Sequence, residues 1–170
     1  MWFLRYYCQL WVNLPKKHKM VKSRYQAISN TNIPVVQLQD DATARIIAGE
    51  FGGTKGPAKT YSPINLWDVS LPKKGSAIDI PYPKDHACIV FVRRGSVSIN
   101  NKKLGPQDVA LLNMDADVLQ LTVLEGNSSV LIMGGEPMDE PIANRGPFVM
   151  NTQLEIQQAV RDYQNGQFGR

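Results

Sequence analysis

The chain has 170 residues, of which 43% are hydrophobic and 20% are charged. These values are typical of one globular domain, with or without a short appended segment, and they exclude wholesale disorder. No apolar run approaches the roughly 20 residues that a membrane helix needs, so we expect no membrane association. Two cysteines are too few for a disulfide-dense secreted scaffold.

The net charge of +4 is unevenly distributed along the chain. Residues 1–25 carry six basic and no acidic residues, whereas the remaining 145 residues have a net charge of −2. A basic body for gripping nucleic acid is therefore not indicated, and we expect no nucleic-acid partner. The run Lys-Lys-His-Lys at residues 16–19 has no interleaved aromatic residues, which favours a solvated loop over a nuclear or nucleic-acid patch.

The first residues are apolar and aromatic but do not form a typical export signal. Arg5 lies inside the apolar stretch, and no small-residue cleavage site follows it. We therefore predict a cytoplasmic protein in which Cys8 and Cys88 are free thiols.

Short strands follow one another along most of the chain. Residues 9–14 alternate between apolar and polar and predict a strand, whereas residues 29–42 are polar and indicate a linker. Strands are then predicted at 43–48, 59–61, 64–70, 76–80, 86–92, 96–100, 108–112, 117–124 and 129–133. Regular turn signals between them, such as Gly105-Pro106, indicate an all-β sandwich or barrel. The strand at 86–92 is apolar on both faces and is predicted to be central.

One helix is predicted close to the C-terminus. Thr152 and Glu155 have the spacing of a capping box, in which each side chain satisfies a free backbone N–H group at the helix start. An apolar stripe follows at helical spacing, and Asn165-Gly166 supplies a stop. The stripe consists of Ile156, Ala159, Val160 and Tyr163.

Two segments carry a family resemblance. One is Gln-Leu-Trp-Val-Asn-Leu-Pro at residues 9–15, and the other is Gly-Glu-Pro-Met-Asp-Glu-Pro-Ile at 135–142 followed by Gly-Pro-Phe-Val-Met-Asn-Thr at 146–152. Together with Ala-Gly-Glu-Phe-Gly-Gly at 48–53, they make residues 9–169 resemble the second half of a pirin-type protein.

The resemblance implies a cupin (RmlC-like) jelly-roll β-barrel with one C-terminal α-helix. Residues 43–170 would be the C-terminal cupin barrel with its helix, and residues 1–42 an N-terminal strand and linker left from the junction to a missing first cupin. In pirin-type proteins that first barrel carries iron or another divalent metal on three His and one Glu. Some members are reported to oxidise quercetin, and a nuclear member acts as a transcription cofactor.

A metal site inside this second barrel is not expected. When the usual cupin motifs are laid from Gly75 and Gly105, the ligand positions fall on proline, cysteine and alanine, none of which is histidine or glutamate. These positions are Pro81, Pro83, Cys88 and Ala116. The chain has only two histidines, whereas transition-metal sites need three or four protein ligands. We therefore predict no catalytic, cofactor-binding or metal-binding residues and no cofactor.

One further group of residues could form a binding site. A pocket in the barrel mouth could be lined by Trp67, Tyr82, His86, Cys88 and Phe91, although the same residues could simply fill the core. His86 and Cys88 share one face of a strand, but a buried thiol and a strand-edge imidazole is the favoured interpretation.

Two acidic pairs are interpreted as structural. Asp115 and Asp117 lie in a turn-like connection, and Asp139 and Glu140 lie between prolines in a rigid connector.

Three hypotheses for function follow. The leading one is a metal-free pirin-like cupin module with a binding or assembly role and no catalysis by this chain alone. The alternatives are a quercetin 2,3-dioxygenase-type oxidoreductase and a regulatory module that binds another protein. We also expect a two-fold homodimer, because the apolar N-terminal segment and a surface without its usual partner barrel would otherwise be exposed, with strand exchange at residues 9–14 as one route.

Overall fold

The structure is a computed structural model that describes residues 8–169. Its contacts divide the chain into two compact units. The barrel unit is Tyr25–Met138, and the terminal unit joins the N-terminal segment up to Arg24 with the chain from Asp139 onward. The boundary at residue 42 that the sequence suggested stays a prediction.

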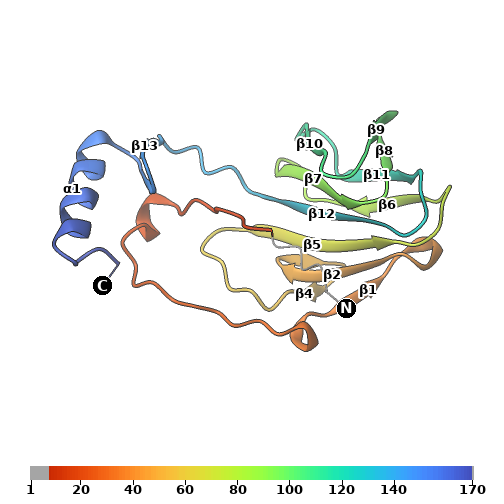
Figure 1. Cartoon of the computed structure of the whole chain (residues 1–170), viewed down its shortest axis with the longest axis horizontal. Helices are drawn as coiled ribbons and strands as arrows, with labels where there is room; N and C mark the ends of the chain where they lie inside the picture. Colours follow the sequence, from red (N-terminus) through yellow and green to blue (C-terminus); the bar gives the residue numbers. More distant parts are fainter. Residues whose placement is uncertain (1–7, 170) are drawn as a thin grey trace, which may run out of the picture. The chain divides into compact units, whose positions relative to one another are not determined.

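The barrel unit consists of two antiparallel sheets (Figure 1). Within the described residues, the larger sheet has six strands in the order β1-β2-β5-β12-β7-β10 and the smaller has four in the order β6-β11-β8-β9. The larger sheet comprises β1 (Val35–Gln37), β2 (Thr43–Ala48), β5 (Ile64–Leu71), β12 (Ser128–Gly135), β7 (Ala87–Arg94) and β10 (Val109–Leu112). The smaller comprises β6 (Ala77–Pro81), β11 (Val118–Val123), β8 (Val97–Ile99) and β9 (Lys102–Leu104).

The core lies between the inner faces of the two sheets. Along each strand every second side chain points inward, so the alternation in the sequence becomes a buried row. On β7 this row is Cys88, Val90 and Val92, and on β6 it includes Ile78 and Ile80, all at most 4% exposed. The predicted all-β fold with a C-terminal helix is confirmed.

Strand β7 is an interior strand of the larger sheet, as predicted from its two apolar faces. It pairs with β12 on one side and with β10 on the other. Its outward residues Ala87, Ile89 and Phe91 are half-buried. Apolar residues on both faces therefore mark a strand that is flanked on both edges.

Two of the predicted strands are wrong. Residues 8–15 form no regular secondary structure, and Leu10 and Val12 are 41% and 56% exposed, because an alternating segment becomes a strand only when another strand pairs with it. Residues 59–61 are also not a strand, and only Ala58 beside them forms an isolated bridge, with Ala48. Conversely, the predicted linker at 29–42 contains β1, which pairs with β2.

Short elements complete the barrel unit near one edge of each sheet. A small hairpin, β3 (Glu50–Phe51) with β4 (Thr54–Lys55), follows β2. The 3₁₀ turn η2 (Asn30–Asn32) precedes β1, and a second 3₁₀ turn, η3 (Gln39–Asp41), follows it and contacts β6. Among the described strands, β1 ends the larger sheet and β6 ends the smaller one, and η3 follows β1 and contacts β6.

The terminal unit has its own small core. The hairpin of β13 (Ala143–Arg145) and β14 (Phe148–Met150) packs against the helix α1 (Gln153–Gln164), with buried Ala143, Met150, Ile156 and Ala159. The N-terminal segment, which includes the 3₁₀ turn η1 (Lys16–His18), is tied to it by hydrogen bonds. Lys16 N donates to Glu140 Oε2 over 2.7 Å, and Lys19 Nζ donates to the Val149 carbonyl over 3.0 Å.

The capping box that the sequence predicted is present in α1. Thr152 Oγ1 accepts from Glu155 N over 3.2 Å, and Thr152 N donates to Glu155 Oε2 over 2.8 Å. In the predicted apolar stripe, Ile156 and Ala159 are buried, whereas Tyr163 is 67% exposed and makes only an edge contact with Phe148. The stripe is therefore narrower than the sequence suggested.

We expect Thr152→Ala to lower the free energy of unfolding by about 1 kcal/mol, because one backbone N–H group of α1 loses its acceptor. Urea denaturation followed by circular dichroism would measure this change. Thr152→Ser keeps the hydroxyl and should retain most of the stability; equal losses in both variants would contradict the role of the cap.

We expect Ile156→Asp to lower the free energy of unfolding by more than about 2 kcal/mol, since it places a carboxylate in the small core of the terminal unit. Leu154→Asp, on an exposed position of the same helix, is the matched control and should cost less than about 0.5 kcal/mol. Similar denaturation midpoints for the two variants would show that this core does not stabilise the helix.

Candidate functional site

Three of the predicted pocket residues meet at one end of the barrel core. Trp67 lies on β5, Tyr82 directly follows β6, and Cys88 lies on β7; they are 1%, 6% and 4% exposed. The Trp67 ring meets Tyr82 edge-on at 5.5 Å between centroids, and Phe51 meets Trp67 edge-on at 5.1 Å. These aromatic contacts fill the end of the barrel with apolar surface.

The phenol of this cluster is hydrogen-bonded, whereas Trp67 Nε1 is buried without a hydrogen-bond partner among the described residues. Tyr82 Oη donates to the Ala87 carbonyl over 2.9 Å, and Asn65 is buried beside it on β5. Gly134 makes this packing possible, because a Cβ atom there would lie 2.6 Å from Tyr82 Oη and 1.8 Å from the Ala87 oxygen. The close approach of β12 to the phenol therefore requires glycine.

Burial keeps the Cys88 thiol and the Tyr82 phenol protonated. It raises the pKa of the Cys88 thiol to about 11, an effect that a hydrogen bond with Tyr82 partly offsets. It also raises the pKa of Tyr82 well above its usual value, and the neighbouring Cys88 adds to that rise. At neutral pH the cluster therefore holds a neutral thiol and a neutral phenol.

The other two predicted pocket residues lie elsewhere. Phe91 is on β7 but points to the outer face of the sheet, opposite to Cys88. His86 precedes β7 and is half-buried, and its Nδ1 has no hydrogen-bond partner among the described residues. The structure thus brings together Trp67, Tyr82 and Cys88, and a ligand pocket made of all five residues stays a prediction.

The cupin motif laid on the sequence has the wrong register at β6. Pro81, Pro83 and Ala116 are exposed, whereas the motif needs inward-facing ligands at these positions. Tyr82, between the two prolines, is the residue that points inward. Of the three positions only Pro81 lies on a strand, and a shift of one residue there would exchange it with the inward-facing Tyr82.

The inward-facing donors do not fit the metal that the family resemblance implies. They are the Asn65 amide, the Tyr82 phenol and the Cys88 thiol, of which none is an imidazole or carboxylate. In the part of the chain that the structure describes, no three His, Cys, Asp or Glu residues are grouped so that they could hold a metal ion. Cys88 alone could act as a soft ligand, and only as a thiolate.

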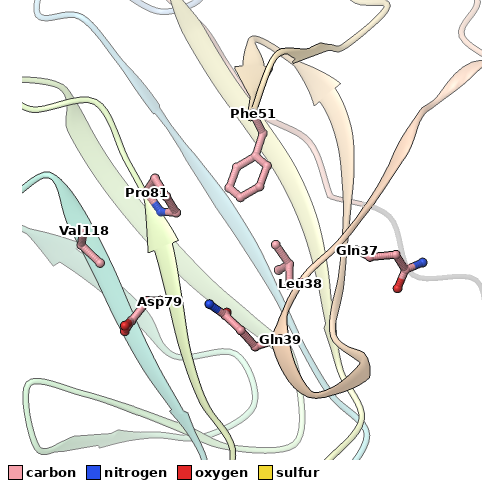
Figure 2. A pocket seen from close by; sticks show the side chains of 7 residues that line it. All are labelled: Gln37, Leu38, Gln39, Phe51, Asp79, Pro81 and Val118. Atoms are coloured by element: carbon pink, nitrogen blue, oxygen red, sulfur yellow. The ribbon is translucent and has the colours of Figure 1, made fainter.

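A hollow of about 530 Å³ lies beside this cluster, between the unpaired edges β1 and β6. It is lined by Gln37, Leu38, Gln39, Phe51, Asp79, Pro81 and Val118. Figure 2 shows the side chains of Leu38 and Phe51 pointing toward each other, with Pro81 and Asp79 on the strand opposite. Phe51 therefore belongs both to the hollow and, through Trp67, to the aromatic cluster.

Sequence reasoning missed this hollow because several of its residues come from segments without a strand or helix signal. Leu38 and its neighbours fall in the predicted linker, and Phe51 in a glycine-rich loop. The one local sign of the hollow in the sequence is Phe51, an aromatic residue flanked by glycines in this loop. Asp79 is held in place at the rim, since its Oδ1 accepts from Gln120 Nε2 over 2.9 Å.

The acidic residues that were interpreted as structural lie in connections between strands. Asp115 and Asp117 are exposed in the connection between β10 and β11. Glu140 Oε2 accepts both from Lys16 N over 2.7 Å and from Asn151 Nδ2 over 3.1 Å, so this carboxylate ties the terminal unit together. Residues 16–18 form the exposed or half-buried turn η1.

Two packed antiparallel sheets followed by one helix define a protein of the cupin class. A crystal structure of quercetin 2,3-dioxygenase from Acinetobacter baumannii superimposes with a TM-score of 0.86 and 40% identity, covering 94% of this chain and 55% of that one. The family profile described as "Pirin C-terminal cupin domain" matches residues 66–169. The chain belongs to the pirin family, as its sequence motifs suggested.

Relatives in several kingdoms share this similarity. A Pseudomonas aeruginosa protein provisionally named a quercetin 2,3-dioxygenase is 46% identical over 95% of this chain, and mouse pirin is 35% identical over the same share. The chain spans 56% of the length of each of these two relatives. Within residues 8–169, no helix is both long and apolar enough to cross a bilayer.

We expect the two thiols to differ strongly in reactivity. Cys8 is exposed, whereas the raised pKa of Cys88 leaves about 100-fold less thiolate at pH 8 than a thiol at the ordinary value of 9.0 would have. A disulfide reagent followed by absorbance should therefore titrate one thiol rapidly in the native protein and the second only after unfolding. Cys8→Ser is the control and should abolish the rapid phase; a rapid phase that persists would contradict the burial of Cys88.

Proposed function

We propose that this chain is a pirin-type cupin module with a binding or assembly role, and that it does not carry out metal-dependent oxidation by itself. The observation that carries this proposal is the donor set at the end of the barrel. The inward-facing polar groups there are an amide, a neutral phenol and a neutral thiol, whereas a metal-dependent cupin needs several imidazole or carboxylate ligands.

The packing around these groups supports the same proposal. Trp67 and Tyr82 fill the barrel end, and Gly134 allows the backbone of β12 to approach the phenol closely. A substrate and a metal ion would need this volume. The hollow lined by Leu38 and Phe51 lies outside it and combines apolar side chains with the side-chain amide of Gln39 (Figure 2). Such a surface suits a small, mainly apolar ligand with a few hydrogen-bonding groups.

A quercetin 2,3-dioxygenase-type activity is the second candidate. The observation in its favour is the name carried by the relatives from Pseudomonas aeruginosa and Acinetobacter baumannii. This chain spans little more than half of either protein, so that activity would need residues from beyond the matched region. A regulatory module that binds another protein is a third candidate.

We place the module in the cytoplasm. Both cysteines are free, and the buried Cys88 is a neutral thiol packed in the core, which suits a reducing compartment.

We expect the protein, purified without a histidine tag, to contain far less than one iron, nickel or zinc ion per chain and to consume no oxygen with a flavonol. Elemental analysis and an oxygen electrode, with and without added Fe²⁺, would measure both quantities. The longer Pseudomonas aeruginosa relative, treated identically, is the matched control for the assay.

Stoichiometric metal together with flavonol-dependent oxygen uptake would overturn the proposal. In that case Cys88→Ser would show whether the thiol belongs to the site, because loss of the metal in this variant would identify Cys88 as a ligand.

A further inference from the structure

The hollow beside the barrel end is built from three separate parts of the barrel unit. The chain between β1 and η3 supplies Leu38 and Gln39, the β3–β4 hairpin supplies Phe51, and the neighbouring strands β6 and β11 supply the opposite wall. Its volume of about 530 Å³ lies within the roughly 300–1,000 Å³ of small-molecule sites. The hollow is therefore large enough for a ligand of about the size of an amino acid or a somewhat larger molecule.

The walls of the hollow are apolar and firmly supported. Leu38 and Phe51 are half-buried, pack against the main core and point toward each other (Figure 2). Phe51 is backed by Trp67, whose ring meets it edge-on at 5.1 Å between centroids. On the opposite wall, Pro81 and Val118 are direct partners in the pairing of β6 with β11. An apolar group in the hollow would therefore lie between an aromatic ring and a pair of hydrogen-bonded strands.

The charge on the lining of the hollow is negative. Among the described residues that line it, Asp79 is the charged one, and no lysine or arginine is present. The carboxylate of Asp79 is held by Gln120, whose Nε2 donates to Oδ1 over 2.9 Å, and in the described chain it has no ion-pair partner. Figure 2 shows the side chain of Gln39 extending toward the side on which Asp79 lies. The rim thus offers a carboxylate and an amide oxygen as acceptors.

The turn η3 adds a further negative charge next to this rim. Asp40 and Asp41 directly follow Gln39, and both pair with Lys73, at 3.8 Å and 3.6 Å. Two carboxylates against one ammonium leave an excess of one negative charge. Charges within the Debye length of about 8 Å act on a ligand most strongly, so an anion in the hollow would be repelled and a cation attracted.

We propose that the hollow binds a small organic cation, namely a protonated amine carried on a compact apolar or aromatic body; the inference rests on the proposed binding role. The ammonium group pairs with Asp79 and donates to the amide oxygen of Gln39, while the body lies against Phe51. An ammonium group close to the face of an aromatic ring is attracted by the ring as well. The apolar walls and the negative rim are then both used by one ligand.

An extended peptide fits the hollow less well than a small cation. A peptide that adds to a sheet edge needs a continuous row of backbone donors and acceptors. Pro81 on β6 has no backbone N–H group, β1 is only three residues long, and η3 contacts β6. Recognition in the hollow therefore depends on side chains, which favours a compact ligand.

Titration of the whole chain with three probes of similar size but different charge, followed by the amide chemical shifts in NMR spectra, tests the proposal. The probes are phenethylammonium, phenylethanol and phenylpropionate. We expect phenethylammonium to give saturable shifts at the amides around the hollow and to bind about 10-fold or more tightly than phenylpropionate, with phenylethanol between them. The amides are those of Leu38, Gln39, Phe51 and Asp79.

Two variants at the rim and one control sharpen the test. Asp79→Asn keeps the acceptor for Gln120 and should weaken phenethylammonium about 5-fold while leaving phenylethanol unchanged, because only the charge is lost. Gln39→Lys, at an exposed position, should make phenylpropionate the tighter probe. Glu125→Gln is the matched control, since it removes the same charge from an exposed residue beyond the other end of β11, and it should change no affinity.

The proposal would be overturned if none of the probes gave saturable shifts at these amides, or if the cation and the anion bound equally well. It would also be overturned if Asp79→Asn and Glu125→Gln had the same effect. Metal content and oxygen uptake, measured on the same sample, test the proposed function separately. An iron-bearing protein that oxidises a flavonol would refute that function, whereas the affinities of the three probes decide the cation site by themselves.

Discussion

The antiparallel ladder of β5, β12 and β7 is the interaction on which the remaining structure depends. Each of these strands is eight residues long, and β12 pairs with both of the others along its length. The register fixes which side chains point inward, so Trp67 and Cys88 enter the core at the same end. It also fixes which side chains point outward. The aromatic cluster and the outward side chains of Ile89 and Phe91 are therefore on opposite sides of one ladder, and a slip by one residue would exchange the two sides.

The strands of this ladder could be predicted from the sequence because each carries its own signal. Alternation, turn residues and length place β5, β7 and β12 within one or two residues of their observed bounds. The capping box at Thr152 is equally local, since both partners lie within one helical turn. Residues 9–14 show the limit of such signals: alternation alone does not provide a pairing partner, and the segment forms no regular secondary structure.

The candidate site was harder to predict because its geometry depends on contacts between distant residues. The hollow needs Leu38 from one sheet edge and Pro81 from the other, and neither position has a distinctive local pattern. The apolar content of β7 was visible in the sequence, but that the outer neighbours of Phe91 are also apolar depends on the strand order β12-β7-β10. The inward direction of Tyr82 between two prolines likewise depends on how β6 pairs with β11.

The physical contrast between the two sides of the ladder bears directly on function. On the inside, burial holds the phenol of Tyr82 and the thiol of Cys88 neutral, and their hydrogen bonds are made within the barrel. Such an interior excludes water and is packed with neutral groups. A catalytic metal site instead requires charged or imidazole ligands and a position that is open to substrate. On the outside, the same strands carry apolar side chains. Burying apolar surface contributes a favourable free energy of about 25 cal/mol per Å². The neutral groups of the interior and the outward apolar side chains of β7 are therefore both set by the register of this one ladder.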